Sequence, residues 1–423
     1  MAYFYGGASW PGHAEWRAGA APEDGSTADA RPAPADLAQS FFSEDDRPGP
    51  AAGSGSDPLS RLLAAVDPVS DSAMTYFYGH LFAIEPQARA MFPPAMNFQR
   101  KRFYQALTRI VACAGDPGQL TSYLEGLGRA HRKFGVQKEH FNAFRQALAA
   151  TWQRYAPAEW TDATAVAWND LFDRAATVMT EAAGRDAEHS PPWWLAEVVA
   201  HEPRGSDLAV LTLLPGQPLP YQPGQHVSIQ TPRWPRLWRT YSVANAPRED
   251  GTLTFHVRAV PGGLVSATLV HHVSAGDTLL LGAAAGPMTA DVTSGRDVLG
   301  LAGGTGLAPV KAIVEAVING PATGRRREIV LYHGARREAG LYDLADLRQL
   351  ERGYPWLQVV PVVSGEAAPD AIFGSVPDVV GLSSWRDRDI YIAGPDAMVA
   401  RTVRELKHRG APPERIHYDG PAI

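Results

Sequence analysis

Residues 299–309 read LGLAGGTGLAP, and this stretch decides the fold of the C-terminal part of the chain. The apolar residues at its start suit a buried strand, and the residues after it suit a helix with Pro309 in the first turn. Glycine lets a backbone come close to the group that it faces. Between strand and helix lies a turn made of Gly303, Gly304, Thr305 and Gly306. The order predicts one unit of an α/β fold, although the spacing is not the GxGxxG of a Rossmann fingerprint.

Similar strand-like segments lie on both sides of this stretch. Helical stretches begin near Ala308, Leu341 and Asp396 and alternate with them. This alternation predicts a doubly wound parallel sheet, which we place at residues 291–423. The strand-like segments read DVLGLAG (297–303), EIVLYHGA (328–335), LQVVPVV (357–363) and DIYIAG (389–394).

The pattern is different further upstream. Residues 189–290 hold short alternating segments such as LAEVVAH, HVSIQT and TLTFHVRAV, separated by the turns PGQ, EDG and PGG, which predicts a small antiparallel β-barrel. Residues 57–188 have a helical period throughout, with Thr161 as a candidate N-cap, and predict an all-α domain. Residues 1–56 are rich in Ala, Pro, Gly, Ser and Asp and predict a disordered tail.

Composition excludes several classes of protein. The formal net charge of -6 offers no basic field for nucleic acid. No apolar run approaches the roughly 20 residues that span a bilayer, so we expect a cytoplasmic protein without membrane insertion. Nothing indicates an obligate protein partner. Cys113 is the one cysteine, which excludes intramolecular disulfides, Cys₄ iron–sulfur clusters and Rieske centres.

Two motifs in the barrel region suit a flavin nucleotide. The tetrapeptide Arg239-Thr240-Tyr241-Ser242 offers a guanidinium for pyrophosphate, a ring that can stack on the isoalloxazine, and a hydroxyl for the ring nitrogen that accepts hydride. A strand with a surface arginine is the alternative. Further on, Gly263 precedes a helix that carries Ser266 in its first turn, where free backbone N–H groups can meet phosphate.

Five motifs in order, PGQHV, RTYS, PGGLVS, GGTGLAP and IAGPDAM, resemble those of the ferredoxin-reductase type of flavoprotein. The resemblance implies an FAD-binding barrel followed by a domain that binds NADH, with NADPH possible. His226 takes the position where many relatives have an aromatic flavin contact. The residues that the resemblance assigns to FAD are His226, Arg239, Tyr241, Ser242, Gly263 and Ser266. Those assigned to the nicotinamide nucleotide are Gly303, Gly304, Thr305, Gly306, Pro309, Gly394 and Pro395.

The sequence departs from this family at two places. Ala393 stands where relatives have the cysteine of a CGP motif, and the chain ends HYDGPAI without a terminal aromatic residue. Both departures affect the expected rate of hydride transfer. Arg336 and Arg337 follow the YHGA strand and either meet a 2′-phosphate or form a solvated basic loop.

A reductase without a cluster needs another one-electron acceptor, and the helical domain contains a candidate. His131 lies in the stretch GLGRAHRKFG (126–135) and shares a helix face with Leu120, Leu124 and Leu127. A histidine on an apolar face is either a core residue satisfied by a backbone carbonyl or a ligand of haem iron.

The helical domain resembles the globin of flavohaemoglobins, through FYGHLF (77–82), MF (91–92), FYQALTRI (103–110) and HRKFGVQKEHF (131–141). The resemblance implies haem b bound by His131 as the proximal ligand. It makes Tyr78 the distal hydroxyl that binds O₂, although a core tyrosine with a carbonyl partner is the alternative. It also places Phe92, Phe103 and Leu107 around the porphyrin.

The proximal side departs from the family pattern. Phe141 stands where flavohaemoglobins have a tyrosine, and Ala183 stands where they have a glutamate, with Glu181 two residues out of register. The resemblance implies an enzyme that passes electrons from NAD(P)H through FAD to haem and converts O₂ and nitric oxide to nitrate. A reductase for another acceptor, such as peroxide or a metabolite, and a globin gas or redox sensor are the alternatives.

Overall fold

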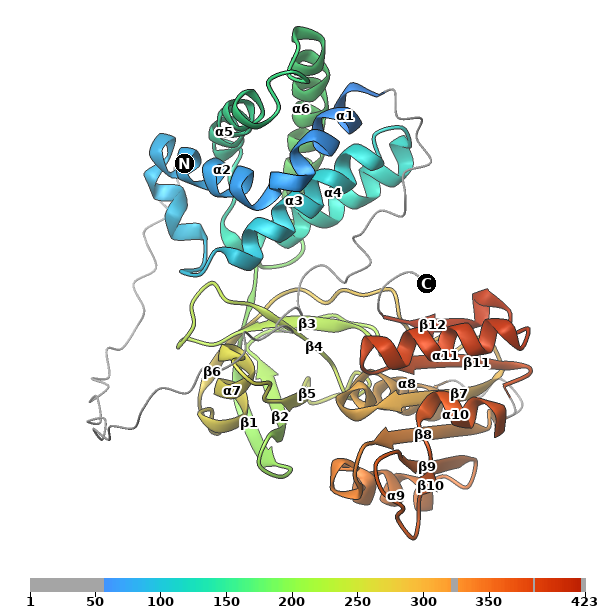
Figure 1. Cartoon of the computed structure of the whole chain (residues 1–423). Helices are drawn as coiled ribbons and strands as arrows, with labels where there is room; N and C mark the ends of the chain where they lie inside the picture. Colours follow the sequence, from blue (N-terminus) through green and yellow to red (C-terminus); the bar gives the residue numbers. More distant parts are fainter. Residues whose placement is uncertain (1–56, 321–325, 383–384, 420–423) are drawn as a thin grey trace, which may run out of the picture. The chain divides into compact units, whose positions relative to one another are not determined.

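The computed structural model describes residues 57–320, 326–382 and 385–419 (Figure 1). The disordered tail expected at residues 1–56 lies outside the described residues. Within the described residues, no helix is long and apolar enough to cross a membrane.

Six helices form the all-α domain, and local sequence explains where several of them begin. The side chains of Asp57, Asp116 and Thr161 each accept a hydrogen bond from a backbone N–H in the first turn that follows. The N-cap expected at Thr161 is thereby confirmed. The helices are α1 (Pro58–Val66), α2 (Ser70–Ile84), α3 (Asn97–Ala112), α4 (Pro117–His131), α5 (His140–Tyr155) and α6 (Asp162–Ala187).

Two apolar clusters hold these helices together. The larger is built from α1, α2, α3, α5 and the first half of α6, and it includes Phe77, Leu107 and Trp152. The smaller lies between α4 and α6. These two helices approach closely because α4 has a glycine at the crossing: a Cβ on Gly128 would lie 2.3 Å from the Met179 carbonyl oxygen.

The next domain is a six-stranded antiparallel sheet in the order β4-β3-β6-β1-β2-β5. A bridge between Val243, directly after β4, and Phe255 within β5 joins the two edge strands, so the sheet curls into a nearly closed barrel. The predicted barrel is confirmed, but strand β6 (Thr278–Leu281) was not expected. The other elements are β1 (Trp194–Pro203), β2 (Leu208–Pro215), β3 (His226–Gln230), β4 (Arg239–Ser242), β5 (Leu253–Arg258) and helix α7 (Leu264–His271).

The last domain is a parallel sheet in the order β10-β9-β8-β7-β11-β12. One apolar cluster packs helices α8 (Leu307–Asn319) and α9 (Leu344–Gly353) on one face, and a second packs α10 (Val376–Val379) and α11 (Asp396–His408) on the other. The doubly wound fold is confirmed. The strands are β7 (Asp297–Gly303), β8 (Ile329–Ala335), β9 (Leu357–Val363), β10 (Ile372–Phe373), β11 (Arg388–Ala393) and β12 (Ile416–Tyr418).

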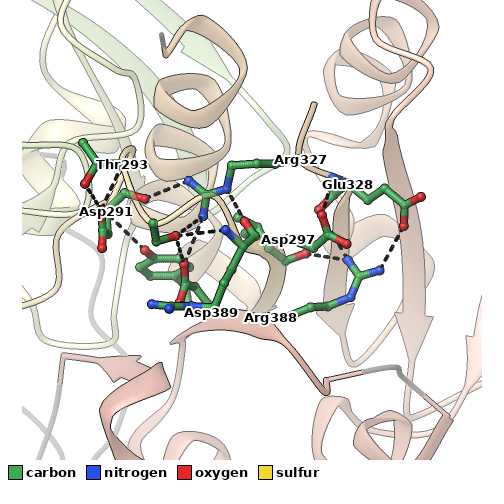
Figure 2. Close-up of polar contacts among 11 residues, drawn as sticks. Asp291, Thr293, Asp297, Arg327, Glu328, Arg388 and Asp389 are labelled. Atoms are coloured by element: carbon green, nitrogen blue, oxygen red, sulfur yellow. Dashed lines mark hydrogen bonds and ion pairs between the residues drawn. The ribbon is translucent and has the colours of Figure 1, made fainter. Parts of the chain in front are cut away.

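A buried polar network ties the start of this sheet to the segment before it (Figure 2). Asp389, at the start of β11, is fully buried and accepts from Arg296 Nε at 2.7 Å and from Arg327 Nη2 at 3.0 Å. Arg327 also donates from Nη1 to the Asp291 carbonyl at 2.7 Å. Buried charges are tolerated where each has such partners. The network therefore fixes the amino ends of the strands, opposite the edge that holds the glycine turn.

Candidate functional site

His131 is the last residue of α4, and its ring has a defined tautomer. Its Nδ1 lies 2.6 Å from the Leu127 carbonyl oxygen. A carbonyl only accepts, so Nδ1 carries the hydrogen and Nε2 keeps its lone pair. Burial lowers the pKa of His131, although the Leu127 carbonyl raises it in part. The result is a neutral imidazole whose Nε2 can bind a metal.

Tyr78 on α2 supplies a buried hydroxyl that has no normal hydrogen bond to a described residue. The side chain is 4% exposed, and no described residue forms a hydrogen bond of normal geometry with its oxygen. Burial raises the pKa of Tyr78, which the neighbouring Gln99 side chain and Arg100 charge only partly offset. No carbonyl of a described residue accepts a hydrogen bond of normal geometry from this hydroxyl. An orphaned buried hydroxyl is unfavourable unless a ligand or water meets it.

Aromatic rings surround Tyr78. Phe92 meets it edge to face with centroids 5.3 Å apart, and Phe103 lies 5.8 Å away while stacking on Phe77 at 4.7 Å. Leu107, one turn further along α3 than Phe103, belongs to the same apolar cluster. The structure thus brings together the four distal residues that the sequence singled out. Phe144 on α5 completes the group, 6.0 Å from Phe103, and was not expected.

The proximal side lacks the polar groups that the family pattern would supply. Phe141 packs edge to face against Phe172, with centroids 6.3 Å apart. Glu181 is exposed and pairs with Arg185, Oε2 to Nη1 at 3.9 Å. Neither Phe141 nor Ala183 can hydrogen-bond an imidazole through its side chain.

These residues fit a haem in two respects. A neutral imidazole with an available Nε2 is the donor that haem iron takes in globins. A buried hydroxyl among aromatic rings, without a normal hydrogen bond to a described residue, is suited to meet a small polar ligand. Within the described residues, no group of three or more metal-binding side chains exists.

In the barrel, the flavin candidates lie on two neighbouring strands. Strands β3 and β4 pair antiparallel, with Val227 opposite Tyr241 and His226 opposite Ser242. Opposite residues share a face, so Tyr241 lies over the barrel core and Ser242 on the other face with His226. Arg239 shares the face of Tyr241 and donates to the Trp238 carbonyl at 2.9 Å.

Strand β4 is also open on one side. It pairs fully with β3, whereas toward β5 only the bridge at Val243 follows it. An edge strand presents backbone N–H and C=O groups. The polar edge of an isoalloxazine requires such groups, and therefore β4 can serve a flavin through its backbone as well as its side chains.

The loop before α7 has a tight internal geometry. A Cβ on Gly263 would lie 2.4 Å from Ser266 Oγ, so only glycine fits. Ser266 is buried, and its hydroxyl accepts from Val260 N at 3.3 Å and lies 3.4 Å from the Gly263 carbonyl. Its hydroxyl therefore shapes the loop. The N-cap of α7 is Gly263, without a side-chain cap, which leaves backbone donors of the first turn for an anion.

His226 has a partner that the sequence did not reveal. Its Nδ1 lies 2.9 Å from Asp419 Oδ2, and Gly286 passes so close that a Cβ would lie 2.9 Å from the same nitrogen. Asp419 follows β12, almost 200 residues later. Asp419 thus brings a carboxylate to the flavin candidate.

The glycine turn, Gly304–Gly306, lies at the carboxyl end of β7 beside the end of β11. A Cβ on Gly306 would lie 2.4 Å from the Ala393 carbonyl oxygen, and one on Gly303 would lie 2.5 Å from Met398 Sδ. These two glycines serve turn-to-turn packing. Gly304 is different: its φ is +54°, and a Cβ there would meet nothing within 4 Å.

The other nucleotide candidates lie at the same edge of the sheet. Gly394, with φ +153°, and Pro395 form the turn between β11 and α11, and Pro309 is buried in the first turn of α8. Arg336 and Arg337 are exposed just after β8. Ligands of open α/β sheets bind at the carboxyl ends of the strands, where all of these residues lie.

Comparison with known proteins agrees with this arrangement. The globin family matches residues 75–179, the oxidoreductase FAD-binding domain matches residues 196–289, and the oxidoreductase NAD-binding domain matches residues 301–404. A flavohemoprotein of Rhizobium meliloti is 27% identical over 382 residues, which cover 81% of this chain and 91% of the relative. The chain is a flavohaemoglobin-like protein. Haem, FAD and NAD are thus the cofactors of its three domains.

A solved flavohaemoglobin from Malassezia yamatoensis with bound FAD and haem has the same fold, with a TM-score of 0.69 and 18% sequence identity. The match covers 87% of this flavohaemoglobin-like chain and 99% of the Malassezia chain. The reductase half also has relatives of its own. The reductase subunit of an aromatic O-demethylase from Amycolatopsis is 36% identical over 216 residues, or 48% of this chain. This chain spans only 61% of that relative's length.

Proposed function

We propose that the chain is an NAD(P)H-dependent flavohaem oxidoreductase that acts as a nitric oxide dioxygenase. Two nitric oxide and two O₂ molecules take the two electrons of one NADH and yield two nitrate ions, NAD⁺ and a proton. One observation carries the proposal: the neutral His131 with its available Nε2 and the orphaned Tyr78 hydroxyl lie in one domain of a chain that also contains a flavin reductase.

In the globin domain the chain's residues would bind, orient and exclude water. His131 would hold the haem through Nε2, because Leu127 keeps the hydrogen on Nδ1. The Tyr78 hydroxyl would donate to O₂ in the distal pocket. Phe92 and Phe103 would keep water out, since both belong to the apolar cluster around Tyr78.

In the reductase, Tyr241, Ser242 and the open edge of β4 would hold the isoalloxazine. Arg239 and the first turn of α7, with its loop shaped by Ser266, would hold the pyrophosphate. Bound FAD accepts hydride and releases electrons singly. The glycine turn, with the open space at Gly304, would hold the nicotinamide nucleotide.

The test is rapid mixing of the oxygenated, haem- and FAD-loaded protein with nitric oxide, with nitrate as the measured product. We expect nitrate to form much faster than with free haem, and Tyr78→Phe to slow it. His140→Gln is a suitable control, because His140 lies nine residues from His131 and begins another helix. Nitrate formation no faster than with free haem would remove the dioxygenase activity.

A second activity is favoured by the proximal side. With Phe141 against Phe172, and Glu181 turned to Arg185, neither of these side chains adds to the donor strength that the Leu127 carbonyl gives the imidazole. Such a haem would serve an acceptor other than O₂, for example a peroxide. NADH consumption that depends on peroxide but ignores nitric oxide would establish this alternative. NADH is the expected donor, and exposed Arg336 and Arg337 favour NADPH as the other choice.

A further inference from the structure

His333 on β8 is a buried histidine that none of the roles above uses. Its side chain is 0% exposed, and neither ring nitrogen forms a hydrogen bond of normal geometry with any residue that the structure describes. The ring meets Tyr342 edge to face, with centroids 5.6 Å apart. A neutral imidazole always carries one N–H, so a buried donor here is left unmet.

A second histidine also meets the Tyr342 ring edge to face. His256 on β5 is 5% exposed, and its Nδ1 lies 2.8 Å from the Tyr342 hydroxyl. Beside the pair, Lys311 Nζ contacts Asp343 Oδ2 at 2.6 Å. The remaining charged groups that face this histidine–tyrosine cluster are Arg204, Arg258 and Asp346.

Both histidines are neutral at physiological pH. Burial lowers the pKa of His333 to about 4, with Asp343 and the Gly304 backbone raising it and Lys311 lowering it. Burial, Lys311 and His333 together hold the pKa of His256 well below its usual range. Cationic rings would be buried beside Lys311, so each ring stays neutral and keeps a single N–H.

The glycine turn, Gly304–Gly306, packs against both β5 and β8, the strands that carry the two histidines. The Gly304 backbone faces the His333 ring closely enough to raise its pKa, although no complete hydrogen bond forms. The Gly304 carbonyl already accepts from Leu307 N and has a second lone pair available. A small movement of the turn toward β8 would let the buried imidazole donate to it.

We infer that His333 is a positioning residue for the nicotinamide nucleotide: its buried N–H donates to the Gly304 carbonyl when the turn holds the nucleotide. The inference rests on the proposed nucleotide site. The unmet donor favours the position of the glycine turn in which the Gly304 carbonyl accepts from His333. A buried hydrogen bond of this kind changes the equilibrium between the two turn positions by roughly tenfold. Nucleotide affinity therefore depends on a histidine that does not touch the nucleotide.

The test measures NADH-dependent reduction of ferricyanide by the full chain with FAD, since ferricyanide takes electrons directly from flavins. His333→Leu removes the donor, and we expect it to raise KM for NADH about tenfold while kcat changes less than twofold. His333→Gln retains an N–H donor and should restore KM to within about threefold of the wild type. His408→Gln, on the exposed end of α11, is the matched control.

Different failures have different meanings. A wild-type protein that does not reduce ferricyanide with NADH overturns the nucleotide site and this inference with it. Normal wild-type activity with an unchanged KM in His333→Leu overturns the inference alone, as does an equal loss in the Leu and Gln variants. If the Leu variant does not fold, the ¹⁵N shifts of the His333 ring in the wild type decide. They should change when NAD⁺ is added, and constant shifts would contradict the inference.

Discussion

The neutral His333 predicts how the stability of the reductase depends on pH. The folded ring has a pKa of about 4, whereas an unfolded histidine has its usual value of 6.5. Because the unfolded chain binds the proton more readily, stability is fully present above pH 6.5 and is lost as pH falls from 6.5 toward 4. The difference of about 2.5 pH units corresponds to roughly 3.4 kcal/mol at full effect.

A practical comparison uses pH 7.5 and pH 5.0. At pH 5.0 the unfolded histidine is almost fully protonated and the folded one about one-tenth, so the contribution of His333 falls by about 2 kcal/mol between the two conditions. His333→Gln has no titrating group and should lose this part of the pH dependence. The free energies of unfolding of wild type and variant should therefore converge by about 2 kcal/mol at pH 5.0.

The assay is urea unfolding of the FAD-loaded chain, followed by the fluorescence of released FAD at both pH values. His256 titrates in the same direction in both proteins, and because His333 also lowers its pKa, the comparison measures the titration of His333 together with this coupling. His408→Gln should behave as the wild type at both pH values. A stability difference between wild type and His333→Gln that stays constant with pH would refute the reasoning.

Three substitutions test other parts of the structure. Tyr78→Phe removes an orphaned hydroxyl, so thermal stability should change by less than about 1 kcal/mol. Release of O₂, followed by rapid mixing, should become roughly tenfold to a hundredfold faster. Slower unfolding of the variant without faster O₂ release would contradict the distal role of Tyr78. Gly306→Ala places a Cβ 2.4 Å from a carbonyl oxygen, so it should lower the free energy of unfolding by about 1–3 kcal/mol and raise KM for NADH. An unchanged urea midpoint and an unchanged KM would argue against tight packing at Gly306. Asp389→Asn leaves Arg327 buried and poorly paired, so it should lower the free energy of unfolding in urea by about 3–5 kcal/mol. Asp387 is exposed, and Asp387→Asn should leave this free energy nearly unchanged. Equal effects of the two substitutions would show that the network in Figure 2 is not stabilising.

Sequence alone was sufficient for the long elements and for the order of the three folds. The apolar runs around 299–309 and the helical period from residue 57 depend on local patterns, which a single sequence records. The four-residue strand β6 and the even shorter β10 and β12 were missed. Their residues become strands because neighbouring strands supply hydrogen-bond partners, which no local pattern reveals.

For the candidate haem and nucleotide sites, too, the sequence predicts features that depend on local spacing but not those that depend on packing. Helical spacing placed His131 on an apolar face with three leucines, and those leucines are buried as expected. It could not show that Leu127 fixes the tautomer or that Tyr78 has no partner, because both depend on packing. Gly303 and Gly306 were interpreted as places for ligand approach, yet their immediate neighbours are protein atoms from the β11 end of the sheet, some 90 residues away.

Other functional candidates were invisible for a similar reason. Asp419 lies next to His226 only because β12 joins the edge of the parallel sheet. The sequence does carry a signal for His333, because a histidine within the apolar strand IVLYHGA is unusual and predicts a buried imidazole. Its pairing with His256 through Tyr342 depends on two strands that are far apart in sequence.

The absorption spectrum of the purified full chain, supplied with hemin and FAD and then treated with NADH without oxygen, tests the central claim most directly. The account predicts a Soret band beside the flavin bands, followed by reduction of both cofactors by NADH. His131→Ala should keep the flavin bands and lose the stable haem. A yellow protein that never shows a Soret band, even with added hemin, would contradict the account.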